Sequence, residues 1–447
     1  MPKIKHRTIN FSVAPPRFVI AAGAIAALLG LGKPAWARPA LGGFVEGIQA
    51  LRLEENVALD GGLAFEERAY PRSELRAQLT VADSLGSGAF FLRTDLSSDA
   101  TRSETGRAEI DLREAFIKLR LVDWLDLKLG RQVATWGTGE LVFANNLFAK
   151  DWEAFFTGLD DAYLESPQDL LWVAVRFSGA TVEIALSPYF TPDRLPDGER
   201  LSVYNPFFDT FVSADAMPRV AVPGRRLDNS ELFGRLIGQA GSYDWALYGY
   251  SGFWPTPQQV GFAWDDFAQD YRPYLAYPAL SSGGFSLRSR ARGFLLSAEG
   301  ALYYSEDDSD GDDPLIANSE LRGIFGLERS LGGDWSVGAQ YYGISMLDYA
   351  GYEAGFPQGA APLDKLRSTA TLRVNRFLLD RDLQLSLFAF VGIDDEDWHL
   401  RPALHYQLTD AVRWTLGANF MGGEFPYTPF GQLEHNASIY TRLRYSL

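Results

Sequence analysis

The amino-acid sequence predicts an all-β protein whose strands close into a transmembrane antiparallel β-barrel of about 18 strands, with 16 strands as the alternative. Three observations lead to this fold class. Apolar and polar residues alternate along successive segments, short turns and long loops follow one another in order, and the chain begins with an export leader. A two-residue period with one apolar face suits a sheet that meets lipid on one side and water on the other.

The alternation is clearest in the segment 382–393. Every odd-numbered residue there is apolar, whereas Asp382, Gln384 and Ser386 share the opposite face. The same pattern recurs, with arginines opposite the apolar residues, in the segments 398–408, 412–421 and 438–447. Arginines are rarely buried without a partner, so they predict a wet interior rather than a packed apolar core.

The turn residues predict the number of strands. Short turns are expected near 83–88, 122–124, 178–180, 241–243, 291–293, 332–334, 380–382 and 409–411. Long connections are expected near 54–71, 98–108, 136–168, 191–229, 255–280, 306–318, 347–365, 394–397 and 422–435. Eight turns that interleave with nine loops give 18 strands. Short periplasmic turns and long extracellular loops are typical of a bacterial outer-membrane barrel, which closes because lipid cannot satisfy an open sheet edge.

The N-terminus predicts export by a cleavable signal peptide. Basic residues precede an apolar run of 14 residues, Phe18 to Leu31, and the segment Ala35-Trp36-Ala37 fits a small-residue cleavage site. This run is shorter than the roughly 20 residues that a membrane-spanning helix needs. We therefore expect residues 1–37 to be the signal peptide and residues 38–447 to form the barrel in the outer membrane of a Gram-negative cell.

Composition narrows the functional classes. The chain has 447 residues and no cysteine, which excludes disulfides and thiolate metal sites. Removal of residues 1–37 would delete five Lys/Arg and no Asp/Glu, and so change the net charge from −16 to −21. Such acidity argues against nucleic acid as a partner. Aromatic residues make up 14% of the chain, which suits interfacial girdles around an apolar band.

One strand and loop resemble a known group of proteins. The segments 127–139, with its Gly-Arg-Gln, and 141–151 resemble the strand-plus-loop motif of Gram-negative outer-membrane porin-like β-barrel proteins, in the alginate-export-like and substrate-selective porin groups. The last strand resembles the signal that the barrel assembly machinery reads, although it ends on Leu447 where Phe is usual. The resemblance implies outer-membrane lipid and lipopolysaccharide, the assembly machinery and small hydrophilic solutes as partners, with a homo-oligomer as an open alternative.

The connection 136–168 is the candidate constriction loop. Its glycines allow a sharp departure from the strand, and its middle is aromatic and acidic. In the porins that this chain resembles, the third loop folds inward and narrows the lumen. We expect the same here, with wall arginines facing the loop's acidic residues; a loop packed on its extracellular neighbours is the alternative. The candidate constriction residues are Trp136, Asp151, Glu153, Asp160 and Asp161.

The alternation assigns a set of basic residues to the lumen face, where rings of Arg and Lys favour anions. These candidate pore-lining residues are Arg76, Arg93, Lys118, Arg120, Arg235, Arg288, Arg290, Arg322, Arg367, Arg373, Arg401, Arg413, Arg442 and Arg444. Inward carboxylates would neutralise several of them and leave a polar wall without selectivity, which is the competing interpretation; they are Glu114, Glu299, Glu320 and Glu328. Arg131 has the wrong parity for the lumen unless Gly130 marks a bulge.

Catalytic and metal chemistry has little support. Only three histidines follow the leader, and the sequence contains no nucleophile elbow, Walker loop or HExxH motif, so we expect neither an enzyme nor a cofactor. The acidic run 306–313 has Asp308, Asp310 and Asp312 around a glycine but lacks the closing Glu of a calcium loop. A solvated loop tip is the preferred interpretation, with weak calcium binding as the alternative.

The sequence therefore predicts an outer-membrane porin, a channel for passive diffusion of small hydrophilic solutes with a lean towards anions. One alternative is an export conduit for an acidic polysaccharide, which would need a wide and continuously basic lumen. A second alternative is the barrel sheath of a porin–cytochrome electron conduit, in which the haem protein would be a separate chain because this one has no cysteine.

Overall fold

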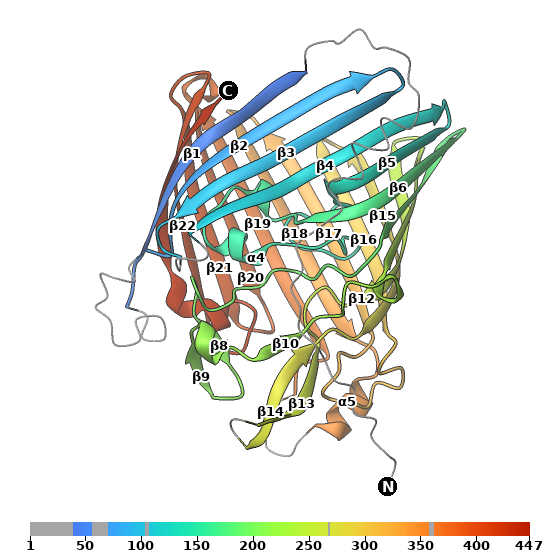
Figure 1. Ribbon diagram of the computed structural model, residues 1–447, viewed down its shortest axis with the longest axis vertical. Helices are drawn as coiled ribbons and strands as arrows, with labels where there is room; N and C mark the ends of the chain where they lie inside the picture. Colours follow the sequence, from blue (N-terminus) through green and yellow to red (C-terminus); the bar gives the residue numbers. More distant parts are fainter. Residues whose placement is uncertain (1–38, 56–69, 103–106, 267–268, 357–361) are drawn as a thin grey trace.

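The wall of the molecule is one closed antiparallel sheet. The computed structural model describes residues 39–55, 70–102, 107–266, 269–356 and 362–447, so the expected leader lies outside the described residues. Eighteen strands form a continuous sheet. It closes because β1 (Ala40–Arg52) pairs along its length with β23 (Ser438–Ser446) (Figure 1). The predicted 18-stranded barrel is confirmed.

The other wall strands follow in chain order, each antiparallel to its neighbours. They are β2 (Arg72–Leu85), β3 (Gly88–Asp99), β4 (Ala108–Val122), β5 (Leu125–Val133), β6 (Pro167–Phe177), β7 (Ala180–Ser187), β11 (Glu231–Ala240), β12 (Tyr243–Phe253), β15 (Ala279–Ala291), β16 (Phe294–Ser305), β17 (Glu320–Leu331), β18 (Trp335–Met346), β19 (Leu366–Leu378), β20 (Leu383–Gly392), β21 (Asp397–Gln407) and β22 (Val412–Gly423). The eight short turns and nine long connections fall between these strands in the predicted order.

The long connections carry the smaller elements, most of which lie toward one end of the barrel (Figure 1). They contain α4 (Trp152–Phe156), α5 (Tyr349–Gly355), the pair β8 (Val203–Asn205) and β9 (Thr210–Val212), and a three-stranded sheet of β10 (Arg219–Ala221), β13 (Gln259–Asp265) and β14 (Asp270–Ala276). They also contain the 3₁₀ turns η1 (Asp161–Tyr163), η2 (Ala214–Ala216), η3 (Leu227–Asn229) and η5 (Gly431–Asn436), whereas η4 (Leu379–Arg381) lies in the short turn between β19 and β20. Among the described helices, none is long and apolar enough to cross a membrane.

The two faces of the wall differ as the alternation predicts. Large apolar side chains such as Leu247, Phe325 and Leu443 are exposed on the outer face. Charged side chains such as Arg76 and Glu299 are buried on the inner face. This distribution follows from the pleat of a strand, because successive side chains point to opposite sides.

One bulge changes the parity of β4. Arg93 of β3 lies opposite Glu114, whereas the next residue, Thr94, lies opposite Leu112. Arg113 is therefore the extra residue of a β-bulge. Arg113 stacks on the inward Tyr163 and Glu114 pairs with the inward Arg93, so two consecutive side chains point into the barrel.

Candidate functional site: a loop held across the lumen

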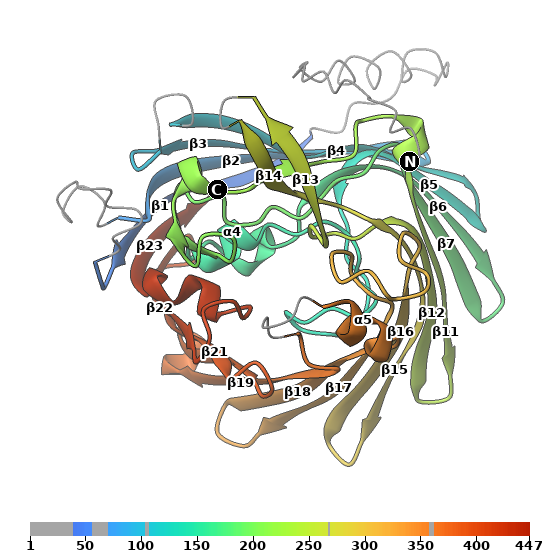
Figure 2. The ribbon, with the colours of Figure 1, turned by 90° about the horizontal axis from the view of Figure 1, so that it is seen from below.

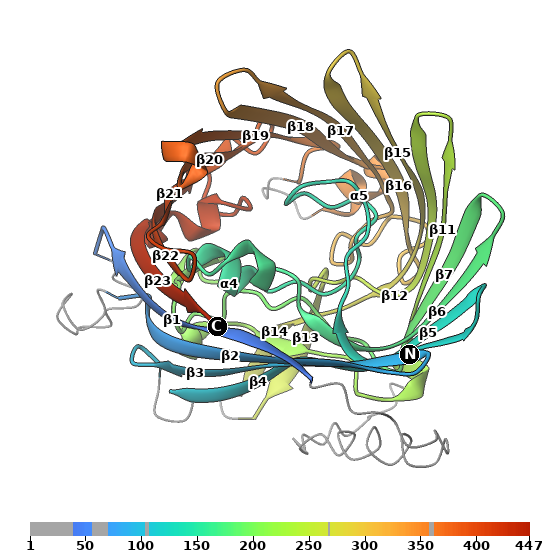
Figure 3. The same ribbon diagram turned by 90° about the horizontal axis from the view of Figure 1, so that it is seen from above.

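The connection of residues 134–166, here called the cross-lumen loop, lies inside the barrel (Figures 2 and 3). It leaves β5 through Gly137, whose φ of 85° lies in the left-handed region. Gly139 is needed for close packing, since a Cβ there would lie 2.1 Å from the carbonyl oxygen of Val142. These two glycines let the backbone turn from the wall toward the lumen.

Glu299 of β16 anchors the start of the cross-lumen loop to the far wall. Its carboxylate accepts a hydrogen bond from the backbone N–H of Thr138 and another, at 2.9 Å, from the backbone N–H of Gly139. The side-chain amide of Asn145 donates a third hydrogen bond to it at 3.0 Å. The Tyr303 hydroxyl donates to a loop carbonyl at 2.8 Å. Because β16 stands six strands from β5 around the barrel, these bonds hold the loop across the lumen.

Trp136 packs the loop onto the nearer wall. Its buried ring meets Phe148 of the same loop edge-on, with centroids 5.1 Å apart. It also meets Trp172 of β6 and Phe233 of β11, with centroids 5.5 and 6.3 Å apart. Edge-to-face contacts at these distances stabilise the pairs beyond simple burial.

The end of the loop is fixed by wall arginines. Asp161 pairs with Arg401 of β21 at 2.7 Å. Asp160 lies 3.3 Å from Arg444 and 3.6 Å from Arg442, both of β23. Burial alone would raise the pKa of Asp160, but these two guanidinium groups outweigh burial and hold its pKa below the usual value. The carboxylate therefore stays charged at neutral pH.

A further ion pair links the loop to β19. Glu140 contacts Arg373 at 2.6 Å, and Arg373 also contacts Glu328 of β17 at 3.2 Å. Burial raises the pKa of Glu140, and Glu328 adds to this effect while Arg373 opposes it. The cross-lumen loop is thus held by β16, β19, β21 and β23, on the far side of the barrel from β5.

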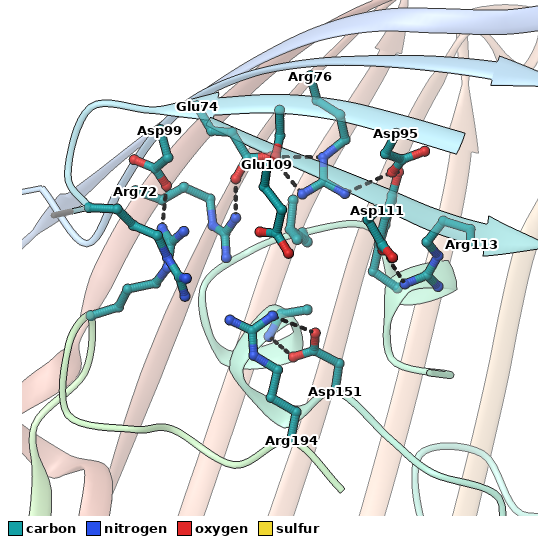
Figure 4. A pocket seen from close by; sticks show the side chains of 16 residues that line it. Arg72, Glu74, Arg76, Asp95, Asp99, Glu109, Asp111, Arg113, Asp151 and Arg194 are labelled. Atoms are coloured by element: carbon teal, nitrogen blue, oxygen red, sulfur yellow. Dashed lines mark hydrogen bonds and ion pairs between the residues drawn. The ribbon is translucent and has the colours of Figure 1, made fainter. Parts of the chain in front are cut away.

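An ionic cluster fills the space between α4, the wall strands β2–β4 and the connection of residues 188–230 (Figure 4). At its centre, the buried Glu153 contacts Arg102 at 2.9 Å, Arg194 at 3.0 Å and Arg200 at 3.1 Å. Surrounding members include Arg72, Glu74, Asp99 and Asp151, and they line a cavity of about 50 Å³. The cluster ties three connections to the wall.

The connection of residues 188–230 also holds the cross-lumen loop through Asp193. This carboxylate accepts a hydrogen bond from the backbone N–H of Lys150 and another from the Trp152 indole, both at 2.8 Å. Burial raises the pKa of Asp193 to about 6, although Lys150 and the Trp152 hydrogen bond oppose the shift.

Toward the short-turn end of the barrel, cations outnumber carboxylates. Asp126 of β5 contacts Lys118 at 3.9 Å, Arg120 at 3.2 Å and Arg176. Arg176 and Arg288 line an open recess of about 580 Å³. We call Lys118, Arg120, Arg176 and Arg288 the basic belt. Asp244 lines the same recess, so the four cations of the basic belt lie near two carboxylates, Asp126 and Asp244, and cations remain in excess.

The predicted pore-lining residues differ in their pairing. Eleven form ion pairs with carboxylates: Arg76, Arg93, Lys118, Arg120, Arg235, Arg322, Arg367, Arg373, Arg401, Arg442 and Arg444. Within the described ranges, Arg288, Arg290 and Arg413 have no carboxylate partner. Asp151 and Glu153 were expected to face wall arginines; they lie near Arg72 of β2, but their ion pairs are with arginines of neighbouring loops. The two carboxylates meet Arg102, Arg194 and Arg200, because α4 lies beside those loops.

Sequence reasoning missed several residues of this site. The loop arginines Arg102, Arg194 and Arg200 lie in segments without periodicity, so no pattern could place them. Glu299 was expected to neutralise wall arginines, but its carboxylate accepts backbone and amide hydrogen bonds from the cross-lumen loop. Arg113 is inward because of the bulge in β4, which interrupts the alternation.

The calcium candidates do not converge. Asp308 accepts hydrogen bonds from the backbone N–H groups of Asp312 and Asp313, so its carboxylate closes its own turn. No group of three acidic, histidine or cysteine side chains in the described part of the chain has a metal-binding arrangement. His399 lies buried among aromatic rings, and His405 contacts Thr415 at 3.1 Å.

Comparison with known proteins supports the fold. No protein-family model and no curated protein sequence matches this chain. The solved structure of OccK11 (OpdR) from Pseudomonas aeruginosa is similar over 91% of this chain and 95% of that one, with a TM-score of 0.50 at 13% identity. The chain therefore shares the closed β-barrel fold of that protein. Looser similarity covers 92% of this chain in two others: a loop-deletion mutant of OmpT, an outer membrane protein of Vibrio cholerae (99% of that chain, TM-score 0.42, 9% identity), and a mutant Rh. blastica porin (100% of that chain, TM-score 0.39, 10% identity).

Proposed function

We propose that this porin-like barrel is an outer-membrane channel for passive diffusion of small hydrophilic solutes. The observation that carries the proposal is the cross-lumen loop, which is anchored on the far wall by Glu299, Arg373, Arg401 and Arg444. A polar wall narrowed by an anchored loop suits a filter for small solutes. An extended polysaccharide would need an unobstructed lumen, so small solutes are the preferred cargo.

We further propose a moderate preference for anions, set by the basic belt rather than by the total number of wall arginines. Most wall arginines share their charge with carboxylates, whereas three cations surround Asp126. Lys118 and Arg120 are more than half exposed, so their excess charge acts on ions in the lumen. Rings of exposed cations raise the local concentration of anions.

Planar-bilayer recording tests both parts of the proposal. The purified protein should give conductance steps, and the reversal potential in a KCl gradient should show chloride preference. Asp126→Asn removes the shared carboxylate and should increase that preference. Asp380→Asn is the matched control, because it makes the same charge change in a short turn at the same end of the barrel. Absence of conductance refutes the channel, and cation preference refutes the anion part alone.

A further inference from the structure

Arg131 lies in the Gly-Arg-Gln segment, and its side chain points away from the lumen. In β5, Leu129 is exposed on the outer face, while Gln132 is fully buried on the inner face. Arg131 shares the parity of Leu129 and therefore faces outward. It stands two residues before Val133, where β5 ends and a long connection begins. This outward cation lies near the long-loop rim.

The contacts of Arg131 form a small charged cluster on the outer face. Its Nε donates to the Leu112 carbonyl at 2.6 Å, and its Nη1 lies 3.7 Å from Asp169 of β6. The Asp169 carboxylate also accepts a hydrogen bond from the Tyr189 hydroxyl. The guanidinium of Arg225 lies 5.0 Å from the centre of the Tyr189 ring. We call Arg131, Asp169, Tyr189 and Arg225 the rim cluster.

The rim cluster carries more positive than negative charge and remains accessible. The cluster contains two guanidinium groups and one carboxylate: Arg131 contacts Asp169, and Arg225 lies over the Tyr189 ring. The side chains of Arg131 and Asp169 are each about one-third exposed. Three residues before Arg225 and two residues after it, the side chains of Val222 and Leu227 are exposed apolar groups. Exposed apolar side chains next to arginines are typical of a segment at the boundary between acyl chains and headgroups.

We propose that the rim cluster binds the phosphorylated headgroup of a lipid in the outer leaflet. Arg131 and Arg225 contact the phosphate, and Val222 and Leu227 contact the acyl chains. Guanidinium forks match phosphate geometry and form charge-assisted hydrogen bonds. A charged side chain on the lipid face is destabilising at the membrane centre but tolerated at the interface, which fits the position of Arg131 near the end of β5.

The lipid site rests on the outer-membrane placement in the proposed function, but not on conduction through the lumen. The Asp169 carboxylate would repel a phosphate, yet its charge is shared by Arg131 and the Tyr189 hydroxyl. The phosphate is therefore expected on the side of the guanidinium groups that faces away from Asp169.

Native mass spectrometry in nonionic detergent, with diphosphorylated lipid A as the probe, measures the binding. The wild-type barrel should bind one molecule, and Arg131→Gln with Arg225→Gln should weaken the affinity at least tenfold. Arg225→Gln alone, in an exposed connection, should weaken it about threefold without disturbing the fold. The control pair Arg290→Gln and Arg413→Gln removes two lumen cations and should leave the affinity unchanged.

Several outcomes would overturn the proposal. An unchanged affinity in the double variant, or equal binding of dephosphorylated lipid A, removes the phosphate site. If millimolar inorganic phosphate displaces all of the bound lipid A, the rim cluster is a site for free anions instead of lipid. Loss of a dimer in the double variant at unchanged lipid affinity makes this face a contact between copies of the chain. Bilayer conductance of the double variant should stay at the wild-type level. The lipid-binding assay therefore tests the lipid site, and the conductance assay independently tests the channel.

Discussion

Glu153→Gln should release the loops that the ionic cluster holds inside the barrel. The Glu153 side chain is only 2% exposed and contacts three guanidinium groups between 2.9 and 3.1 Å. Glutamine keeps the shape of the side chain but removes its charge. The three cations then lose the carboxylate at their centre; Arg102 and Arg200 remain largely buried, whereas Arg194 is partly exposed to solvent.

The size of the effect follows from the cost of leaving buried charge uncompensated. Removal of one partner from a buried ion pair costs about 3–5 kcal/mol. Nearby carboxylates such as Asp99 and Asp151 still neutralise part of the charge, so we expect the lower end, about 3 kcal/mol. Since about 1.4 kcal/mol is a factor of ten, the released state of α4 should become more than a hundredfold more populated.

Hydrogen exchange of the peptide over residues 151–158 reports this local opening directly. Glu109→Gln is the matched control, because Glu109 lines the same cavity but is exposed, and it has no ion pair within the described ranges. The control should change the opening free energy by less than about 0.5 kcal/mol. If Glu153→Gln accelerates exchange no more than Glu109→Gln, the ionic cluster does not hold the loop and the reasoning is wrong.

Three further changes should have measurable effects on stability. Gly130→Ala should lower the free energy of unfolding by about 2 kcal/mol or more, because φ is 127° and the new Cβ would lie 2.2 Å from a neighbouring carbonyl oxygen. Gly42→Ala is the control: a Cβ at Gly42 would meet no atom within 4 Å, so the free energy of unfolding should hardly change in the same assay. Trp136→Ala should cost about 3–5 kcal/mol through loss of buried aromatic packing, and a loss below about 1 kcal/mol would contradict its role in packing the loop onto the wall. The pKa of Asp193 is raised to about 6 in the folded protein, so between about pH 4 and pH 6 the folded protein binds a proton that the unfolded chain releases. The contribution of Asp193 to the free energy of unfolding therefore falls as pH rises through that range. The difference in unfolding free energy between wild type and Asp193→Asn should change from about pH 4 to about pH 6, and a constant difference would contradict the raised pKa.

The sequence predicted the wall more completely than the contents of the lumen. Alternation with period two and turns such as Gly241–Ser242 are local signals, so strand order and the lumen parity of Arg401 followed from them. Contacts between loops depend on how distant segments meet in space, so the pairing of Glu153 with Arg200 left no trace in the sequence. The bulge at Arg113 was missed for a related reason, because one inserted residue reverses parity without changing composition.

Two carboxylates of this barrel each face three cations, yet they should have different effects. Glu153 and its partner Arg200 are almost fully buried, so their interaction holds loops in place and has little influence on ions in the lumen. Asp126 pairs with Lys118 and Arg120, whose side chains are more than half exposed, so in the proposed channel the unbalanced charge there should act on passing ions and be screened by salt. In the proposed channel, the exposure of an ion pair, and not the number of arginines, should therefore decide which cluster sets ion selectivity. It follows that anion preference should decline as ionic strength rises, while protection of α4 from hydrogen exchange should change little, because screening reaches exposed charges far more than buried ones.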